Sequence, residues 1–388
     1  MKPTRDGAHA PYPWEYAEPI FSGDLFFERF AEMCRAAQLS IDIDFYIFED
    51  DVVGRQIFAE LAAAKQRGVK VRIIVDGFGS VWWPSYFGVD AQKSGIEYRV
   101  YHHLWFESFL MNRPRIQEKL RGFLSWIQIL NRRNHRKIAI FDRTISLVGS
   151  RNISAVHAES VMGSYTWRDS SIQLHGPGVS ILAEHFDYVW NSHRLLRRFK
   201  RNGSLPGPPN GSIRHNLTRS ARKRNLIRLL SDINGAKCRI WITNAYFVPQ
   251  NRLLTALKRA AKRGCDVQII LPAISDVFFI PWVTSTLQQE LIESGVQIFE
   301  YLPSILHAKS IIIDDWVMLG SSNLNHRSFL HDLETDVVVF DPNTTALFSN
   351  QFEIDRSRSR EVGIQSFQPL KAWSRTMGTL LWPLRRWM

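Results

Sequence analysis

The stretches His135-Arg136-Lys137-Ile138-Ala139-Ile140-Phe141-Asp142 and His307-Ala308-Lys309-Ser310-Ile311-Ile312-Ile313-Asp314 carry the same pattern. In each, one residue separates a histidine from a lysine, and four residues separate the lysine from an aspartate. A Gly-Ser-x-Asn sequence follows both copies, with Ser150 and Asn152 in the first and Ser321 and Asn323 in the second. A lone histidine near a lysine is usually a solvated surface pair, but two matching copies make coincidence negligible.

The spacing predicts how the two side chains lie. Alternate residues of an extended strand point to the same face, so His135 and Lys137 share one face, as do His307 and Lys309. The apolar residues that follow each lysine are typical of an interior strand. We therefore expect two rigidly held histidine and lysine pairs.

The two halves of the chain repeat one succession of a strand, a helix that ends in glycine and two further strands. In the first half these are residues 41–48, a helix ending at Gly68, residues 69–75 and residues 95–101; in the second they are residues 239–248, a helix ending at Gly264, residues 267–271 and residues 295–301. Glycine after a basic helix end and β-branched runs on either side indicate β-α-β units with a parallel or mixed sheet. The sequence predicts an α/β fold with two similar α-β-α sandwich lobes related by a pseudo-twofold axis, and an active site between them.

The spacing of the repeat also indicates the domain organisation. Gly95 and Gly295 are 200 positions apart and the two histidines 172 apart, so the first half carries a net insertion of 28 residues (200 − 172). We expect an N-terminal lobe over residues 15–200 with an insertion at residues 102–134. A proline- and glycine-rich linker over residues 201–218, a C-terminal lobe over residues 219–360 and a basic, tryptophan-rich tail over residues 361–388 complete the division.

Composition limits the partners and the compartment. The net charge of +12 favours an anionic partner, either lipid headgroups or nucleic acid. Three cysteines far apart in the sequence give no disulfide framework and no zinc spacing. Because no signal peptide and no apolar run long enough to span a membrane is found, we expect a protein on the cytoplasmic side, free or peripheral to a membrane.

The paired motifs favour phosphoryl chemistry. A histidine can attack phosphorus or protonate a leaving alkoxide, and lysine and asparagine donors can stabilise charge on phosphoryl oxygens. Neither half supplies both histidine roles alone, so the halves have to face each other with the phosphate between them. This chemistry needs no metal or other cofactor, and none is expected.

With these motifs the sequence resembles the phospholipase D superfamily across nearly its whole length. The resemblance implies a phosphohistidine intermediate, with His135 as the nucleophile and His307 as the acid and then the base. It assigns phosphate binding to Lys137, Lys309, Asn152 and Asn323, with Ser150 and Ser321 alongside. The motif aspartates Asp142 and Asp314 are interpreted as mainly structural. Asp169, 34 residues after His135, and Glu334, 27 residues after His307, fall where the family places the carboxylates that orient its histidines.

Further segments are similar to bacterial cardiolipin synthases of the type without N-terminal transmembrane helices. These are residues 48–51, 67–71, 76–80, 167–169, 175–177 and 325–328. The similarity implies transfer of a phosphatidyl group from phosphatidylglycerol to a second phospholipid, with glycerol released. Phosphatidylethanolamine is an alternative lipid partner. Two departures are a second motif that is one residue shorter between aspartate and glycine, and Arg136, an extra cation beside the first lysine.

Basic and aromatic residues in the insertion 102–134 and in the tail 361–388 are typical of segments at a membrane interface. Core packing is the alternative for both. A phospholipase D-type hydrolase, or a nuclease whose positive charge serves a nucleic-acid backbone, is the alternative function. No base-reading module supports the nuclease, so no nucleic-acid partner is expected. A non-catalytic scaffold would be expected to lose one motif, and the oligomeric state stays open.

Overall fold

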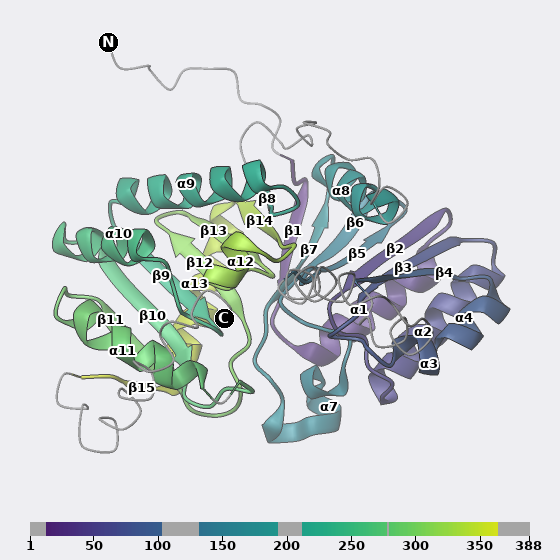
Figure 1. Ribbon diagram of the computed structural model, residues 1–388, viewed down its shortest axis with the longest axis horizontal. Helices are drawn as coiled ribbons and strands as arrows, with labels where there is room; N and C mark the ends of the chain where they lie inside the picture. The colour runs from purple at the N-terminus through teal and green to yellow at the C-terminus, as the bar shows by residue number, and fades with distance from the viewer. Residues whose placement is uncertain (1–12, 103–131, 193–211, 278, 364–388) are drawn as a thin grey trace, which may run out of the picture.

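The computed structural model describes residues 13–102, 132–192, 212–277 and 279–363, which form two lobes side by side (Figure 1). The first lobe contains a mixed sheet whose strands lie in the order β1 (Tyr16–Ile20), β7 (Ser171–His175), β6 (Ile145–Gly149), β5 (Lys137–Phe141), β2 (Ser40–Phe45), β3 (Lys70–Asp76) and β4 (Glu97–Tyr101). The strands β2, β3 and β4 are parallel, and β5 runs antiparallel to β2. The central strand β5 therefore carries the first histidine motif from Lys137 onward.

The second lobe repeats this order and adds one strand. Its sheet runs β8 (Ile213–His215), β14 (Thr335–Val339), β13 (Trp316–Gly320), β12 (Lys309–Ile313), β9 (Arg239–Asn244), β10 (Asp266–Pro272), β11 (Gln297–Tyr301) and β15 (Ser359–Glu361). Read in this direction, β8 corresponds to β1 and β12 to β5. The α/β fold of two similar lobes that the sequence predicts is confirmed.

Helices cover both faces of each sheet. The first lobe contains α1 (Gly23–Ala36), α2 (Val52–Gln66), α3 (Trp83–Tyr86), α4 (Gly88–Ser94), η1 (Ala155–His157), α7 (Glu159–Met162), η2 (Gly163–Tyr165) and α8 (Gly178–Ser192). The second contains α9 (Arg219–Gly235), α10 (Asn251–Lys262), α11 (Ile280–Ile292), α12 (His326–Leu330) and α13 (Pro342–Ser357). The glycines expected to end α2 and α10 do so with positive φ, 94° at Gly68 and 91° at Gly264.

The lobes share part of their core. One apolar cluster joins α1, α2 and α4 to the outer face of the first sheet, and a second joins α9, α10 and α11 to the second sheet. A third cluster contains residues of both sheets together with α8 and α13. The indole N–H of Trp14, ahead of β1, donates to the carbonyl of Val338 on β14 at 3.0 Å. The junction between the lobes is thus packed like a protein interior, which fixes their relative position.

One expected boundary is wrong in detail. The linker was expected to extend to residue 218, but Ile213 and His215 belong to β8, which pairs with Val337 and Thr335 of β14. The second lobe therefore begins before α9, because its edge strand has to pair with β14. Most of the insertion 102–134 and of the tail 361–388, both expected to contact a membrane, lies outside the described residues, namely residues 103–131 and 364–388.

The motif aspartates close the turns at the far ends of the two motif strands. Asp142 and Asp314 both have a φ of 50°, a left-handed conformation that aspartate tolerates better than most residues. The Asp142 carboxylate accepts the backbone N–H groups of Gln38, Leu39 and Ser40 at 2.7 to 2.9 Å. Asp314 accepts those of three residues in the corresponding turn of the second lobe, Lys237, Cys238 and Arg239. Each carboxylate thereby ties a motif strand to the start of its neighbour.

The three hydrogen bonds of Asp142 predict a loss of stability on its removal. Asp142→Ala leaves three backbone donors without that acceptor and should lower the free energy of unfolding by about 2 kcal/mol. Burial raises the pKa of Asp142 and the three N–H groups lower it by more, so the contribution is present above pH ~4 and is lost as the pH falls through the lowered pKa. Urea unfolding at pH 7 and pH 3 measures both effects.

Asp90→Ala is the matched control, because Asp90 is exposed and its nearest cation, Lys93, is 3.9 Å away. Equal unfolding midpoints for the Asp142 and Asp90 variants at pH 7 would contradict the structural role of Asp142.

Candidate active site

The junction between the lobes brings the two motif histidines into one site. His135 and His307 immediately precede β5 and β12, the strands that carry the rest of each motif. The backbone N–H of His135 donates to the carbonyl of Leu333 at 3.0 Å, and that of His307 donates to the carbonyl of Arg168 at 2.8 Å. Each histidine is therefore attached through its own backbone to a segment of the opposite lobe, as a pseudo-twofold axis requires.

The first histidine is oriented by an acid of the second lobe. Nδ1 of His135 lies 3.1 Å from both carboxylate oxygens of Glu334, whose side chain is fully buried. The hydroxyl of Ser328 donates to the same carboxylate at 2.6 Å. With Nδ1 engaged, the Nε2 atom of His135 is the nitrogen left for chemistry.

The second histidine is oriented by an acid of the first lobe. Nδ1 of His307 lies 3.2 and 3.1 Å from the two carboxylate oxygens of Asp169. Ser150 donates a hydrogen bond to Asp169, and Nδ1 of His157 lies 2.9 Å from the same carboxylate. The ring of Trp167 packs against both His157 and His307, with centroids 5.6 Å away in each case.

The two acids differ in protonation although their positions correspond. Burial raises the pKa of Glu334 to about 7, against the lowering effect of Lys137 and of the hydroxyls of Ser321 and Ser328. Burial also raises the pKa of Asp169, but His307 and His157 outweigh it, so this pKa falls well below its ordinary value. Asp169 is therefore a fixed anion at neutral pH, while Glu334 exchanges its proton near neutrality.

The motif lysines are buried beside the histidines. Lys137 donates to the carbonyl of His135 at 2.8 Å, and Lys309 donates in the same way to the carbonyl of His307. Burial and the repulsion of Lys309 lower the pKa of Lys137 to about 7. Burial also lowers the pKa of Lys309 to about 8, against the attraction of Asp169. An anion between the two ammonium groups would relieve this repulsion.

Both histidines are held neutral by their surroundings. Burial lowers the pKa of His135 well below its ordinary value, and the charges of Lys137 and Lys309 lower it further. Burial and Lys309 lower the pKa of His307 to about 4, although Asp169 acts in the opposite direction. A neutral imidazole has the free lone pair that a nucleophile or a general base requires.

The Gly-Ser-x-Asn residues lie close to the same centre. The hydroxyl of Ser150 bonds Asp169, and Ser321 lies against Glu334 and the carbonyl of Thr335. The carboxamide oxygen of Asn152 accepts the backbone N–H of Ile47 at 3.3 Å, and Asn323 is buried beside Ser328. The serines were expected alongside the phosphate, but their hydroxyls bond the orienting acids and the backbone, because those acids are buried beneath the histidines.

Three other motif residues lie outside the site. Asp142 and Asp314 bind turns at the opposite ends of β5 and β12, which agrees with a structural role. Arg136 is fully buried and pairs with Asp44 of β2 on the other face of the strand. The extra cation noted in the sequence is thus directed away from the histidines by strand alternation.

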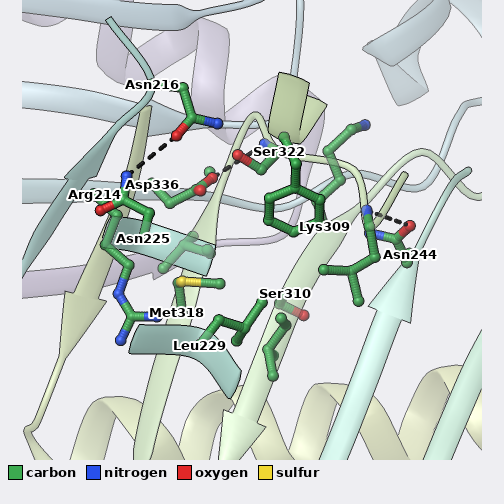
Figure 2. A pocket seen from close by; sticks show the side chains of 15 residues that line it. Arg214, Asn216, Asn225, Leu229, Asn244, Lys309, Ser310, Met318, Ser322 and Asp336 are labelled. Atoms are coloured by element: carbon green, nitrogen blue, oxygen red, sulfur yellow. Dashed lines mark hydrogen bonds between the residues drawn. The ribbon is translucent and has the colours of Figure 1, made fainter. Parts of the chain in front are cut away.

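A small, partly open cavity lies behind the second motif (Figure 2). Its volume is about 20 Å³, which accommodates a water molecule but no lipid or nucleotide. Lys309 and Asn244 line it, with Asp336 bonding the backbone N–H of Ser322 on another wall (Figure 2). Neither motif histidine lines this cavity.

Two tyrosines that contact the histidines were not predicted from the sequence. The ring of Tyr46 lies 5.0 Å from that of His135 and 5.2 Å from the ammonium of Lys137. Tyr246 stands in the same relation to His307 and Lys309, at 6.2 and 5.9 Å. Their offset of 200 positions equals that of the repeated strands and was a usable signal.

His157 and Ser328 were overlooked as well, although each stands five residues after the asparagine of its Gly-Ser-x-Asn sequence (157 − 152 and 328 − 323). Both contact the orienting acid of their own lobe. Because their residue types differ, the comparison of the two halves did not reveal the correspondence.

No described helix has the length and apolar content needed to cross a membrane. Within the same residues, no group of three or more histidine, cysteine, aspartate or glutamate side chains could hold a metal ion.

Comparison with known proteins identifies relatives over the same regions. A family model described as "Cardiolipin synthase, PLD-like domain" matches residues 30–190 and 229–356. Cardiolipin synthase A of Pseudomonas aeruginosa is 28% identical over 355 residues, covering 88% of this chain and 67% of that protein. The cardiolipin synthase of Clostridium perfringens is 27% identical over 370 residues, covering 92% and 73%.

Solved structures support the fold. The crystal structure of phosphatidylserine synthase from Haemophilus influenzae superposes with a TM-score of 0.69 at 16% identity, over 96% of this chain and 93% of that one. Polyphosphate kinase from Porphyromonas gingivalis superposes with a TM-score of 0.56 at 14% identity, over 95% of this chain and 55% of that one. Because the family model covers both lobes and both histidine motifs, the chain belongs to the cardiolipin synthase family with the phospholipase D-like domain.

Proposed function

We propose that this protein is a cardiolipin synthase that transfers a phosphatidyl group from one phosphatidylglycerol to another and releases glycerol. The observation that carries the proposal is the pair of histidines, each oriented by a carboxylate of the opposite lobe, His135 by Glu334 and His307 by Asp169. Two oriented imidazoles beside two buried lysines supply a nucleophile, an acid and a cationic phosphate site.

In the first half-reaction, Nε2 of His135 attacks the phosphorus of the donor phosphatidylglycerol. The phosphorus–oxygen bond to the headgroup glycerol breaks, and His307 donates its Nε2 proton to the leaving alkoxide, which departs as glycerol. The product is a phosphatidyl group bonded to His135. The negative phosphodiester between the lysines raises the pKa of His307, which enables it to bind the proton it has to donate.

In the second half-reaction, the neutral His307 takes the proton of a hydroxyl on a second phosphatidylglycerol. That oxygen attacks phosphorus, the bond to His135 breaks, and cardiolipin is released with both histidines in their starting states. Lys137 and Lys309 remain cations throughout and stabilise the additional charge on the phosphoryl oxygens. Asn152 and Asn323 are proposed as further phosphate donors.

The asymmetry between the orienting acids supports the assignment of His135 as the nucleophile, which the resemblance to the family implies. Glu334 has a raised pKa, so His135 is more easily kept neutral and nucleophilic. Asp169 stays anionic and stabilises the imidazolium form of His307, which is the form a general acid needs. The residue types of the two halves thus support different roles at equivalent positions.

The substrate also determines the location that we propose. Phosphatidylglycerol is an anionic membrane lipid, and the net charge of +12 favours attachment to such a surface. We place the protein on the cytoplasmic face of a bacterial inner membrane, bound peripherally, with phosphatidylethanolamine as an alternative acceptor.

Product analysis tests the function directly. Purified protein is incubated with phosphatidylglycerol vesicles, with a labelled DNA fragment as a parallel substrate, and the lipids are identified by mass spectrometry. Cardiolipin together with an equal amount of free glycerol is the expected result. Phosphatidic acid alone would replace the transferase with a hydrolase, and cut DNA beside unchanged lipid would replace it with a nuclease.

Substitution of the histidines distinguishes their roles. His135→Ala and His307→Ala should each reduce turnover by at least about 10³-fold, because the nucleophile or the acid is lost. With a labelled phosphatidyl donor and alkaline denaturation, the His307 variant should retain labelled protein while the His135 variant should not. His175→Ala, at the end of β7 and away from the site, is the control and should match the wild type. Label retained on the His135 variant would reverse the assignment.

The pKa values of the site predict a bell-shaped pH profile for kcat/KM. Below pH ~7 Glu334 becomes protonated and is a poorer acceptor for the Nδ1–H of His135, so the tautomer with its lone pair on Nε2 loses its support and activity falls. Above pH 7 to 8 Lys137 and then Lys309 lose their charge, and activity falls again. The measurement uses mixed micelles of neutral detergent, so that surface charge does not shift the local pH.

Glu334→Gln is the matched variant for the acidic limb. It should be slower than the wild type and lack the limb below pH ~7, because the carboxamide does not titrate. An unchanged acidic limb in this variant would exclude Glu334 as its source.

A further inference from the structure

Residues 77–89, which we call the aromatic loop, are unusually free of charge for a surface segment. They contain no aspartate, glutamate, lysine, arginine or histidine, whereas the chain average of 22% would give about three in 13 residues (0.22 × 13). Five of their apolar side chains are nevertheless exposed: Phe78 by 54%, Val81 by 39%, Trp82 by 64%, Tyr86 by 51% and Val89 by 56%. Among the described residues, Trp82 is the one tryptophan in the exposed class.

The aromatic loop is anchored at its start and in its middle. At its start, the buried carboxylate of Asp76 accepts the backbone N–H groups of Phe78 and Gly79 at 2.8 and 3.2 Å. In its middle, Trp83 is 1% exposed and packs against Phe48, with ring centroids 5.9 Å apart. Phe78, Val81 and Trp82 lie between these anchors, and Tyr86 and Val89 follow in α3 and α4. The exposed side chains are therefore presented by an ordered segment, which folding alone does not require to be apolar.

The same contacts connect the aromatic loop to the first catalytic histidine. The second carboxylate oxygen of Asp76 accepts the backbone N–H of Asn134, the residue before His135, at 2.8 Å. The hydroxyl of Ser80 donates to the carbonyl of Tyr46, whose ring contacts His135. A Cβ on Gly79 would lie 2.4 Å from that carbonyl, so only glycine permits this approach.

We propose that the aromatic loop is an element that inserts into the lipid bilayer and brings the His135 half of the site to the headgroup layer. This inference rests on the proposed function, for which it specifies how the enzyme engages its substrate. Tryptophan and tyrosine suit the headgroup region, because the apolar body of each ring is buried among lipid while its N–H or O–H group stays hydrated. Phe78, Val81 and Val89 add apolar area beside them. The net charge of +12 complements an anionic lipid surface and adds attraction at longer range.

An aqueous protein partner is less well supported by the same residues. A protein interface is normally surrounded by a rim of polar and charged groups. The aromatic loop has no ionised side chain within residues 77–89, and the charged groups beside it include Arg133, whose guanidinium lies 4.9 Å from the Phe78 ring, and Asp90, which follows Val89. A bilayer requires no such rim. Entry of the aromatic loop into the bilayer beside Asn134 and Tyr46 also explains why this loop is attached to the strand ends that hold His135.

The test compares vesicle binding with catalysis on dispersed lipid. Val81→Ser/Trp82→Ser in the full chain removes two exposed apolar side chains and leaves Phe78 and the anchors Asp76 and Trp83 intact. Sedimentation with vesicles of phosphatidylglycerol and phosphatidylcholine should weaken by at least about tenfold. Turnover of vesicle lipid should fall in parallel, and turnover of monomeric short-chain phosphatidylglycerol should stay within about twofold of the wild type.

Ile227→Ser/Leu347→Ser is the matched control, since Ile227 on α9 and Leu347 on α13 are 54% and 50% exposed. This control should bind vesicles like the wild type. Vesicle binding unchanged by the loop substitutions would overturn the proposal, and so would an equal loss of turnover on monomeric and vesicle lipid with binding intact. Because sedimentation needs no turnover, failure of the proposed reaction would be seen separately in the product analysis.

Discussion

The site depends on one constraint, the crossed pairing of each histidine with a carboxylate from the other lobe. His135 is held by Glu334 and His307 by Asp169, so neither lobe contains a complete oriented histidine. The pairing is possible because the backbone segments beside the histidines also cross, through the bonds to Leu333 and Arg168. The shared apolar core then holds the lobes together and fixes the two histidines relative to each other.

Burial of these ionisable groups carries a desolvation cost, and hydrogen bonds to neighbouring groups offset part of it. The lysines lose hydration, which lowers their pKa values to about 7 and 8, and each gains a carbonyl partner. The acids gain hydroxyl donors from Ser150 and Ser328. Lys309 lowers the pKa of Lys137, so the two ammonium groups repel each other, and an anion bound between them would relieve this repulsion.

The two halves differ in residue type at equivalent positions, and these differences suit the two histidines to different roles. His157 and Ser328 occupy equivalent positions. His307 and, after it, His157 hold the pKa of Asp169 well below its ordinary value, whereas burial raises the pKa of Glu334 although the hydroxyl of Ser328 lowers it. One histidine is thus suited to binding a proton and the other to attack on phosphorus. The aromatic loop is a further asymmetric feature, because it is attached to the strand ends around His135 and exposes apolar rings beside them.

The sequence by itself determined the two-lobe α/β fold, the identity of the motif residues and the family, because these follow from short-range patterns: strand alternation at His135 and Lys137, glycines at helix ends, and a repeat at fixed spacing. Asp169 and Glu334 were also identified as orienting acids. Only the tertiary structure decided that each orients the histidine of the other lobe, that the serines bond those acids, and that Tyr46, Tyr246 and His157 complete the site. Contacts between residues 138 or 199 positions apart depend on how the sheets pack against each other, and no local pattern encodes that arrangement.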